Sequence, residues 1–204
     1  MRCTAPLLAA CAAALVPAEG RAGNAAPFCE LSQLRPGLPG DIEIPTLSTS
    51  DGHTIYCVYS NNTQGIYIQA TRDSGLTWSD PVQIMEPGPR YTTDANILVD
   101  GDRLIVVATH VIDLPEQPGH LARSEFLACV SDNGGQTWSE PQRIPVPRKY
   151  VSGCVNVPVW LEGDTVVMPY SWDVPAEEGN PAAEEGQMWC KAGALISEDR
   201  GRTW

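Results

Sequence analysis

The octet Thr71 to Trp78, TRDSGLTW, is the first of three related copies of one motif in the chain. The second copy is Ser131 to Trp138, SDNGGQTW, and the third is Ser197 to Trp204, SEDRGRTW. Aligned on their tryptophans, the copies share a hydroxyl residue at the first position, Asp or Asn at the third, Gly at the fifth and Thr at the seventh. The chain therefore carries an internal repeat.

Each octet predicts a tight turn with an apolar anchor. A short carboxylate or amide at the third position can accept hydrogen bonds from the backbone of its own turn, and the glycine two residues later permits a positive φ. The tryptophan provides a large apolar side chain to pack against the sheet. The three tryptophans are 60 and 66 residues apart, which leaves room for about four short strands in each repeat.

The octets resemble the Asp-box, S/T-x-D-x-G-x-T-W, of the sialidase superfamily. The first and third copies match at every defined position, and the second has Asn133 where Asp is usual. This resemblance implies an all-β fold, a sialidase-like β-propeller of six four-stranded blades, about three of which lie in this chain. In the family the box lies on turns away from the active site, so the octets are expected to be structural.

The chain is predicted to have three parts. Residues 1–22 are typical of a secretory signal peptide, with an apolar run from Pro6 to Val16 and small residues suited to cleavage. Residues 23–40 form a lead-in rich in Pro and Gly, and residues 41–204 form the incomplete propeller. A secreted or periplasmic protein is expected, and further C-terminal blades would be needed to close the ring.

Composition excludes some classes of partner. The formal net charge is −12 and the sequence pI is near 4.5, which opposes binding to nucleic acid. Outside the N-terminal segment no apolar run is long enough to span a membrane. The three histidines are scattered and no CxxC occurs, so neither a metal nor another cofactor is expected. The expected partner is a glycan or glycoconjugate substrate.

Strand order predicts where the functional face lies. In an up-and-down blade the first turn and the box turn point one way, whereas the start of the first strand and the loop between the second and third strands point the other way. The repeats differ mainly by insertions at residues 111–125 and 173–191 of the second and third copies. We therefore expect the site on the face opposite the octets, because variable loops on a rigid scaffold commonly carry function.

The positions that the family uses for sialic acid are only partly recognisable. The resemblance implies an Arg-Ile-Pro sequence at the start of blade one, whose arginine would clamp a carboxylate. Here the matching residues are Glu43, Ile44 and Pro45. The family's acid/base Asp would lie in residues 60–65, which contain no carboxylate. Sialic acid specificity is therefore doubtful, and the Tyr/Glu nucleophile pair of the family would lie beyond Trp204.

Two carboxylates are the candidate catalytic residues. Asp94 could act as a general acid, or it could cap the turn that enters its strand. Glu43 could be the second carboxylate of a glycoside hydrolase, or an exposed charge at a strand edge. The candidate substrate-binding residues share this face, and they are Arg90, Asn96, His110, Arg123, Asn156, Trp172 and Asp173. For His110 and Arg123, which share one loop, the alternative is a solvated loop, and for Trp172 it is packing in the core.

The sequence thus favours a secreted, exo-acting glycoside hydrolase of sialidase type, which releases terminal sugars from glycans. Two alternatives stay open. One is a propeller without catalytic activity that binds carbohydrate or protein, and the other is an enzyme that modifies polysaccharides by a different reaction.

Overall fold

The computed structural model describes residues 45–204, except residues 62, 114–121, 149, 153–156 and 182–188. All of these residues belong to one compact unit, Leu31–Trp204. They form strands and a short 3-10 helix, η1 (Ala176–Glu178), so the all-β prediction is confirmed. No helix in this part of the chain has the length and apolar content that a membrane span needs. The signal peptide and lead-in predicted for residues 1–40 lie outside the described residues and stay predictions.

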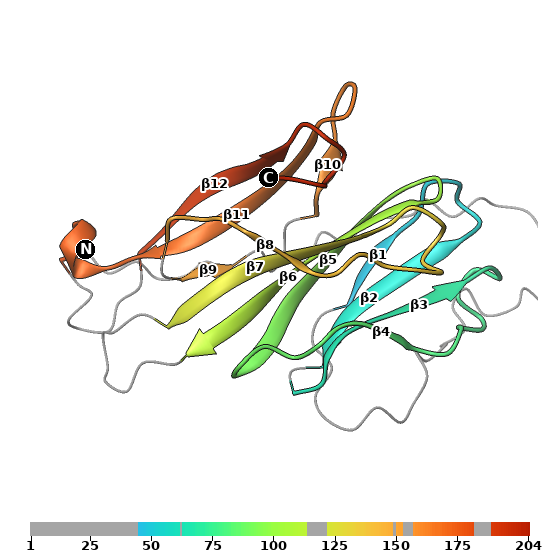
Figure 1. Cartoon of the computed structure of the whole chain (residues 1–204), viewed down its shortest axis with the longest axis horizontal. Helices are drawn as coiled ribbons and strands as arrows, with labels where there is room; N and C mark the ends of the chain where they lie inside the picture. Colours follow the sequence, from blue (N-terminus) through green and yellow to red (C-terminus); the bar gives the residue numbers. More distant parts are fainter. Residues whose placement is uncertain (1–44, 62, 114–121, 149, 153–156, 182–188) are drawn as a thin grey trace, which may run out of the picture. The chain divides into compact units, whose positions relative to one another are not determined.

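The strands form three antiparallel four-stranded sheets (Figure 1). The first sheet has the order β1 (Thr46–Ser48), β2 (Ile55–Asn61), β3 (Gly65–Thr71), β4 (Val82–Met85). The second has the order β5 (Tyr91–Asp100), β6 (Arg103–Asp113), β7 (Arg123–Ser131), β8 (Gln142–Ile144). The third has β10 (Val159–Trp160), β11 (Val166–Val174) and β12 (Trp189–Ser197), and β9 (Val151–Ser152) also pairs with β11.

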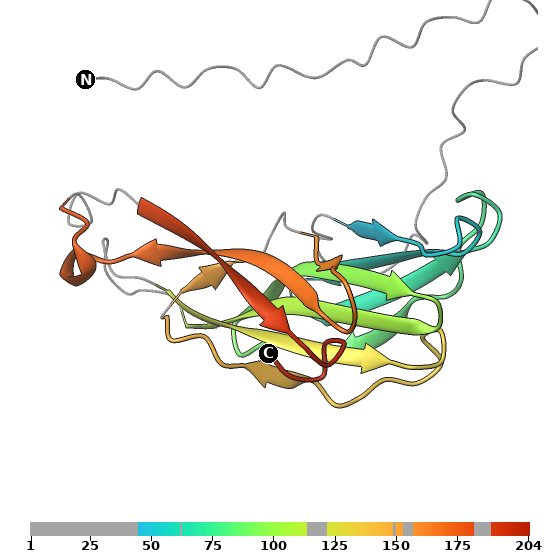
Figure 2. The ribbon, with the colours of Figure 1, turned by 90° about the horizontal axis from the view of Figure 1, so that it is seen from above.

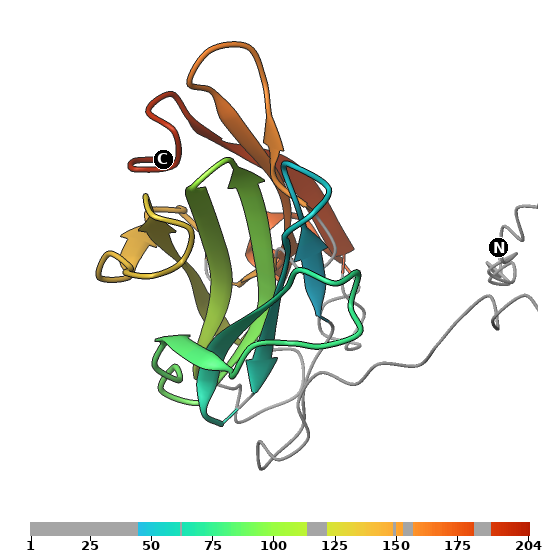
Figure 3. The ribbon, with the colours of Figure 1, turned by 90° about the vertical axis from the view of Figure 1, so that its right-hand side faces the viewer.

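The second sheet lies between the other two, as Figures 1 and 3 show. Alternate residues of β6 explain this position. Leu104 and Val106 belong to the core shared with the first sheet, whereas Ile105 and Val107 belong to the core shared with the third. Because both faces of β6 are buried, the strand is a continuous apolar run rather than an alternating one.

Each octet forms the turn that its residues predict. In the first, the Asp73 carboxylate accepts hydrogen bonds from the backbone N of Thr77 at 2.9 Å and from its hydroxyl at 2.6 Å. The Thr71 hydroxyl donates to Asp73 at 2.8 Å and accepts from the backbone N of Gly75 at 2.9 Å. Gly75 has a φ of 89°, a conformation that glycine adopts without a steric penalty.

The octets lie at one end of the sheets, which we call the box end. Two octets are hydrogen-bonded to the first turn of their own sheet. In the second sheet the backbone N of Gly134 donates to the Asp102 carbonyl at 2.8 Å, and in the third the backbone N of Arg200 donates to the Asp164 carbonyl at 2.9 Å. The end of β6, the start of β7, the end of β11 and the helix η1 lie at the opposite end, which we call the loop end (Figure 2). This is the arrangement that strand order predicted.

The strands β5 and β6 of the second sheet extend toward the loop end beyond the apolar part of the β5 sequence. β5 begins at Tyr91, before the largely apolar run of residues 95–99, and β6 continues to Asp113. Thr92 pairs with His110 and Thr93 with Thr109 across these two strands. Pairing with a long partner strand therefore outweighs the weak apolar pattern of these polar residues.

The acid sensitivity of the box turns gives a first prediction. Hydrogen bonds from Thr77 lower the pKa of Asp73 to about 2, and bonds from Thr203 do the same for Asp199. Because these pKa values lie below the ordinary 3.8, the contribution of both groups to stability is present above that pH and is lost as the pH falls toward 2. Replacing both residues, Asp73→Asn and Asp199→Asn, should flatten the fall of the free energy of unfolding between about pH 4 and pH 2, measured by urea titration.

The second octet supplies the reason that these variants should fold. Asn133 already forms the same turn, accepting from the backbone N of Thr137 at 2.9 Å and donating to its hydroxyl at 2.8 Å. An unchanged acid slope in the double variant would show that the two carboxylates are not responsible for it.

Candidate functional site

The loop end contains a β-bulge at Asp94. Between β5 and β6 the register passes from Thr93↔Thr109 directly to Asn96↔Val107, so Asp94 and Ala95 stand opposite the single residue Ala108. Asp94 has a φ of 56°, in the left-handed region, which costs a residue other than glycine about 1 to 2 kcal/mol. Bulges and strained residues of this kind are frequent beside functional sites, where they redirect a side chain. Asp94 therefore lies inside β5 rather than in the turn before it.

Hydroxyl groups from two sheets hold the Asp94 carboxylate. The Ser152 hydroxyl, on β9 of the third sheet, donates to Oδ2 at 3.0 Å, and the Thr93 hydroxyl donates to Oδ1 at 3.2 Å. The Asn96 side-chain amide donates to the Asp94 backbone carbonyl at 3.2 Å. Ser152 is in turn fixed by antiparallel pairing with Ser171 of β11. The carboxylate is thus oriented at the junction of the second and third sheets.

Buried polar side chains accumulate at the loop end. Burying a polar group is unfavourable unless it gains hydrogen bonds, so a purely structural sheet end would be apolar. At the box end the buried hydroxyl groups form hydrogen bonds within the octet turns. The buried polar residues of the loop end belong to no octet, so they do not have this structural role. Those in the described chain are Ser60, Asn61, Thr92, Thr93, Asn96, Thr109, His110, Ser124 and Asn180. This surplus of buried polar groups marks the loop end as the candidate functional surface.

His110 is a buried titratable group of this surface. It is on β6, opposite Thr92, and its side chain is 7% exposed. A hydrogen bond joins it to the Glu86 backbone, and its Nε2 is buried with no partner among the described residues. Burial lowers the pKa of His110 below its ordinary 6.5. The imidazole is therefore neutral at physiological pH.

The lowered pKa of His110 predicts a pH dependence. As the pH falls below 6.5, the unfolded chain takes up the proton before the folded chain does, so stability decreases until the folded-state pKa is reached. A His110→Gln variant, which keeps an amide donor for Glu86, should lose this decrease. Thermal unfolding midpoints of both proteins between about pH 7.5 and pH 5 would measure it. Parallel pH profiles would contradict the assignment to His110.

Two predicted arginines lie on exposed parts of the loop end. The backbone N of Arg90 donates to the Val111 carbonyl at 3.1 Å, which fixes the main chain just before β5. Arg123 begins β7 and forms an exposed ion pair with Asp113 at 3.3 Å. Both guanidinium groups belong to exposed residues, a location suited to contact with a polar ligand.

Trp172 and Asp173 lie on β11 and are partly buried. The Arg148 guanidinium lies over the Trp172 ring, 4.8 Å from its centroid, and the Tyr170 ring is 5.5 Å away at a tilt. Trp172 packs against the core between the second and third sheets, as one of the two sequence-based alternatives expected. A sugar could stack on this ring only where Arg148 does not cover it. Asp173 accepts a hydrogen bond from the Cys190 thiol at 3.1 Å.

The structure brings together some of the predicted residues and leaves others untested. Asp94 and Asn96 share the bulge, and His110 lies on the neighbouring strand. Glu43 and Asn156 lie outside the described residues. Ser152 and Arg148 were not singled out from the sequence, because a serine in a short strand and an arginine in a loop carry no local signal. Only the pairing of β9 with β11 reveals Ser152 as a partner of Asp94.

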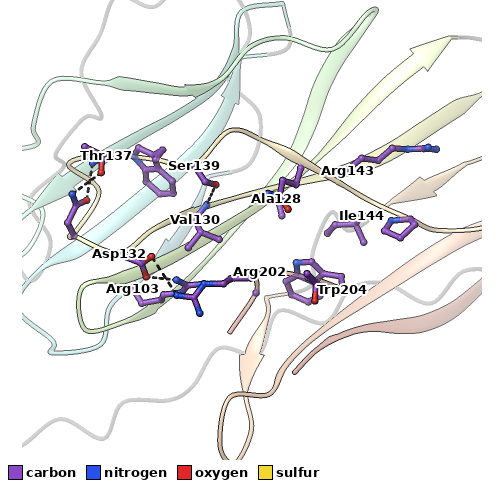
Figure 4. A pocket seen from close by; sticks show the side chains of 16 residues that line it. Arg103, Ala128, Val130, Asp132, Thr137, Ser139, Arg143, Ile144, Arg202 and Trp204 are labelled. Atoms are coloured by element: carbon purple, nitrogen blue, oxygen red, sulfur yellow. Dashed lines mark hydrogen bonds and ion pairs between the residues drawn. The ribbon is translucent and has the colours of Figure 1, made fainter. Parts of the chain in front are cut away.

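A separate cavity of about 600 Å³ lies between the second and third sheets near the box end (Figure 4). Arg103, Asp132, Ile144 and Trp204 are among the residues that line it. Arg103 donates to Asp132, and Trp204 lies beside Ile144. Asp94 does not line this cavity, which is therefore distinct from the loop-end site.

Comparisons with known proteins identify the fold. No protein-family model and no curated protein sequence matches this chain. A solved protein of unknown function from Dyadobacter fermentans is similar, with a TM-score of 0.60 and 15% identity over 78% of this chain and 52% of its own. A Trypanosoma rangeli sialidase, solved with sialic acid, has a TM-score of 0.56 and 18% identity over 80% of this chain and 29% of its own.

The chain thus spans about half the length of the first of these structures and less than a third of the second. At such low identity the likeness establishes the fold alone. The three sheets have the β-propeller fold that is found in sialidases.

Proposed function

We propose that this chain is part of a secreted glycoside hydrolase of sialidase type, which releases terminal sugars from glycans at the loop end. The strained, doubly hydrogen-bonded Asp94 is the observation that carries the proposal. A conformation that costs energy persists where the surrounding structure enforces it, and such strain is characteristic of catalytic positions. The shared fold with a sialidase that was solved with sialic acid supports the same class of reaction.

In this proposal Asp94 is the general acid. Glycoside hydrolysis commonly uses one carboxyl group to protonate the departing glycosidic oxygen and a second one, about 5 to 9 Å away, as nucleophile or base. Glu43 is the proposed second carboxylate. The hydroxyls of Ser152 and Thr93 would hold the Asp94 carboxyl in one orientation, so that its proton is directed at the leaving group.

The remaining loop-end residues would bind the sugar. Arg90 and Arg123 offer several N–H donors for hydroxyls or an anionic group. His110, Asn96 and Asn156 would contribute further polar contacts, and Trp172 with Asp173 would form one wall of the subsite. A carboxylate at Glu43, where the family pattern has an arginine, repels the carboxylate of sialic acid. We therefore propose that the preferred terminal sugar is one without a carboxylate.

A second function is favoured by a specific observation. The loop of residues 60–65, where the family's acid/base Asp would lie, contains no carboxylate. A six-bladed propeller that binds carbohydrate or protein without cleaving it would keep this scaffold and lose the catalytic groups. Both functions place the ligand at the same loop end.

One experiment separates the two functions. The full-length secreted protein would be incubated with fluorogenic sialosides and with a panel of neutral glycosides, and the released fluorophore would be followed. Release from at least one exo-substrate is the expected result. Absence of turnover on the whole panel, together with retained binding on a glycan array, would reject the hydrolase and favour the binding module.

A further inference from the structure

The second octet differs from the other two at two adjacent positions. Its third residue is Asn133, where both other octets have Asp. Its fourth residue is Gly134, where the first octet has Ser74 and the third has Arg200. Together these two departures create the single Asn-Gly pair of the chain.

The geometry of the turn does not require a glycine at position 134. Its φ is 66°, and the equivalent residues Ser74 and Arg200 adopt the same left-handed conformation with φ of 61° and 62°. A Cβ on Gly134 would lie 3.5 Å from the Tyr56 hydroxyl and 3.6 Å from Asp102 Oδ1, which are ordinary van der Waals contacts. The turn therefore accommodates a side chain here, and the consequence of having none is chemical.

An Asn-Gly pair can undergo deamidation. Once the backbone nitrogen after the asparagine has lost its proton to a base, it attacks the side-chain carbonyl carbon. The new bond joins this nitrogen to Cγ, the bond from Cγ to Nδ2 breaks, and ammonia leaves a five-membered succinimide ring. Water then opens the ring, at the bond to Cγ to give aspartate or at the bond to the main-chain carbonyl carbon to give isoaspartate. Glycine favours the attack because it has no Cβ to obstruct it.

In the folded turn both reacting groups are engaged by other partners. The backbone N–H of Gly134, whose proton must leave, donates to the Asp102 carbonyl at 2.8 Å. The Asn133 Oδ1 accepts from the Ser131 hydroxyl at 3.0 Å and from the backbone N of Thr137 at 2.9 Å. Its Nδ2 donates to the Thr137 hydroxyl at 2.8 Å. The attack therefore requires these hydrogen bonds to break.

We propose that Asn133 is a site of spontaneous deamidation and that the second box turn controls the reaction. The closed turn suppresses the attack, and local opening of the turn allows it. Asn133 and Gly134 are partly exposed, so water and base have access to them when the turn opens. Such an opening is a local event that does not require the whole sheet to unfold.

The two products have opposite effects on the turn. Aspartate restores the pattern of the other octets, in which Asp73 and Asp199 each accept from the backbone N and from the hydroxyl of the threonine four residues later. The Thr137 hydroxyl can rotate to donate rather than accept, so the same turn forms. Isoaspartate lengthens the main chain by one carbon and shortens the side chain by one. It therefore cannot reach its partners in the turn, and the turn is disrupted.

Peptide mass spectrometry tests the proposal. The full-length protein would be incubated in a mildly alkaline buffer, both native and unfolded in urea. The tryptic peptide of residues 124–143 contains Asn133, and its asparagine, aspartate and isoaspartate forms can be separated and counted. Deamidation in the native protein should be at least about tenfold slower than in urea. Gly134→Ser should slow the reaction in urea, because the serine Cβ obstructs the attack, and it should fold as Ser74 does in the first turn.

A pair of matched variants separates opening of the turn from global unfolding. Thr137→Val removes the hydroxyl that accepts from Asn133 Nδ2 and should accelerate deamidation of the native protein by about three- to tenfold. Thr77→Val removes the equivalent hydroxyl from the first box turn, where it donates to Asp73. This control should leave the deamidation rate at Asn133 unchanged.

Several results would overturn the proposal. Equal rates in native and unfolded protein would show that the turn does not control the reaction, and absence of deamidation in urea would show that the pair is unreactive. Equal acceleration by Thr137→Val and Thr77→Val would assign the reaction to global unfolding. Asn133→Asp should keep the thermal midpoint within about two degrees, and a larger fall would show that the turn does not accept aspartate. None of these measurements depends on a glycan, so they are independent of the proposed function.

Discussion

Asp94→Asn is expected to lower kcat/KM of the full-length protein by about 10²- to 10⁴-fold on a glycoside with a poor leaving group, because a carboxamide cannot donate the proton that general acid catalysis requires. Asparagine tolerates the left-handed conformation that Asp94 adopts, and its side chain can accept from one of the two hydroxyls, Ser152 or Thr93, and donate to the other. The variant should therefore fold with an unchanged thermal midpoint. Glu162→Gln, an exposed carboxylate at the box end, is the matched control and should keep full activity.

Leaving-group dependence distinguishes an acid from a residue that only supports the fold. A substrate whose leaving group needs no protonation should be cleaved by the Asp94→Asn variant with a much smaller loss. The basic limb of the pH profile should also disappear, since it reports the catalytic acid. Ser152→Ala should reduce kcat by a smaller factor, because Thr93 still holds one oxygen of the carboxylate. Equal losses on both substrates would remove Asp94 from the role of acid.

The sequence predicts most of the scaffold because its turns are specified locally. Three octets contain their own hydrogen-bonding partners within eight residues, such as Asp73 with Thr77, so their geometry can be read without knowledge of distant strands. The alternation of apolar residues then places the sheets, and strand order places the loop end opposite the octets. These features depend on local chemistry and on the period of a strand, which a single sequence shows directly.

The sequence predicts much less of the site because the site depends on distant contacts. The bulge at Asp94 arises where β5 pairs with β6, and the hydroxyl of Ser152 comes from another sheet, 58 residues away. Arg148 covers Trp172 from a loop whose residues have no periodic pattern. The secondary structure of polar residues near strand ends is also hard to predict. The sequence around Thr92 and Thr93 is equally compatible with a loop, and only their pairing with β6 shows that they belong to a strand.

The contact between the second and third sheets at the box end depends strongly on Arg103. Its side chain is 5% exposed, and it donates to the Arg200 carbonyl through Nε at 3.1 Å and Nη2 at 2.6 Å, and to Asp132 through Nη1. Arg200 in turn pairs with Asp100 at 2.6 Å and lies over the Trp160 ring at 5.4 Å. One guanidinium thus connects the start of β6 with two box turns.

Arg103→Met is expected to destabilise the protein by about 2 to 4 kcal/mol, measured as the free energy of unfolding in urea, because the Arg200 carbonyl loses its donors at a closely packed interface. The control, Arg143→Met, removes an arginine that is 65% exposed and paired with Glu125, and should cost no more than about 1 kcal/mol. Arg103→Lys should restore little of the lost stability, since one ammonium cannot reproduce the planar guanidinium that donates to two partners.

The pKa of Asp132 provides a second, local measurement. The hydrogen bond from Arg103 lowers this pKa, so it should rise toward its ordinary value in Arg103→Met, as measured by NMR titration. Equal stability of the two methionine variants would mean that apolar packing alone holds the second and third sheets together.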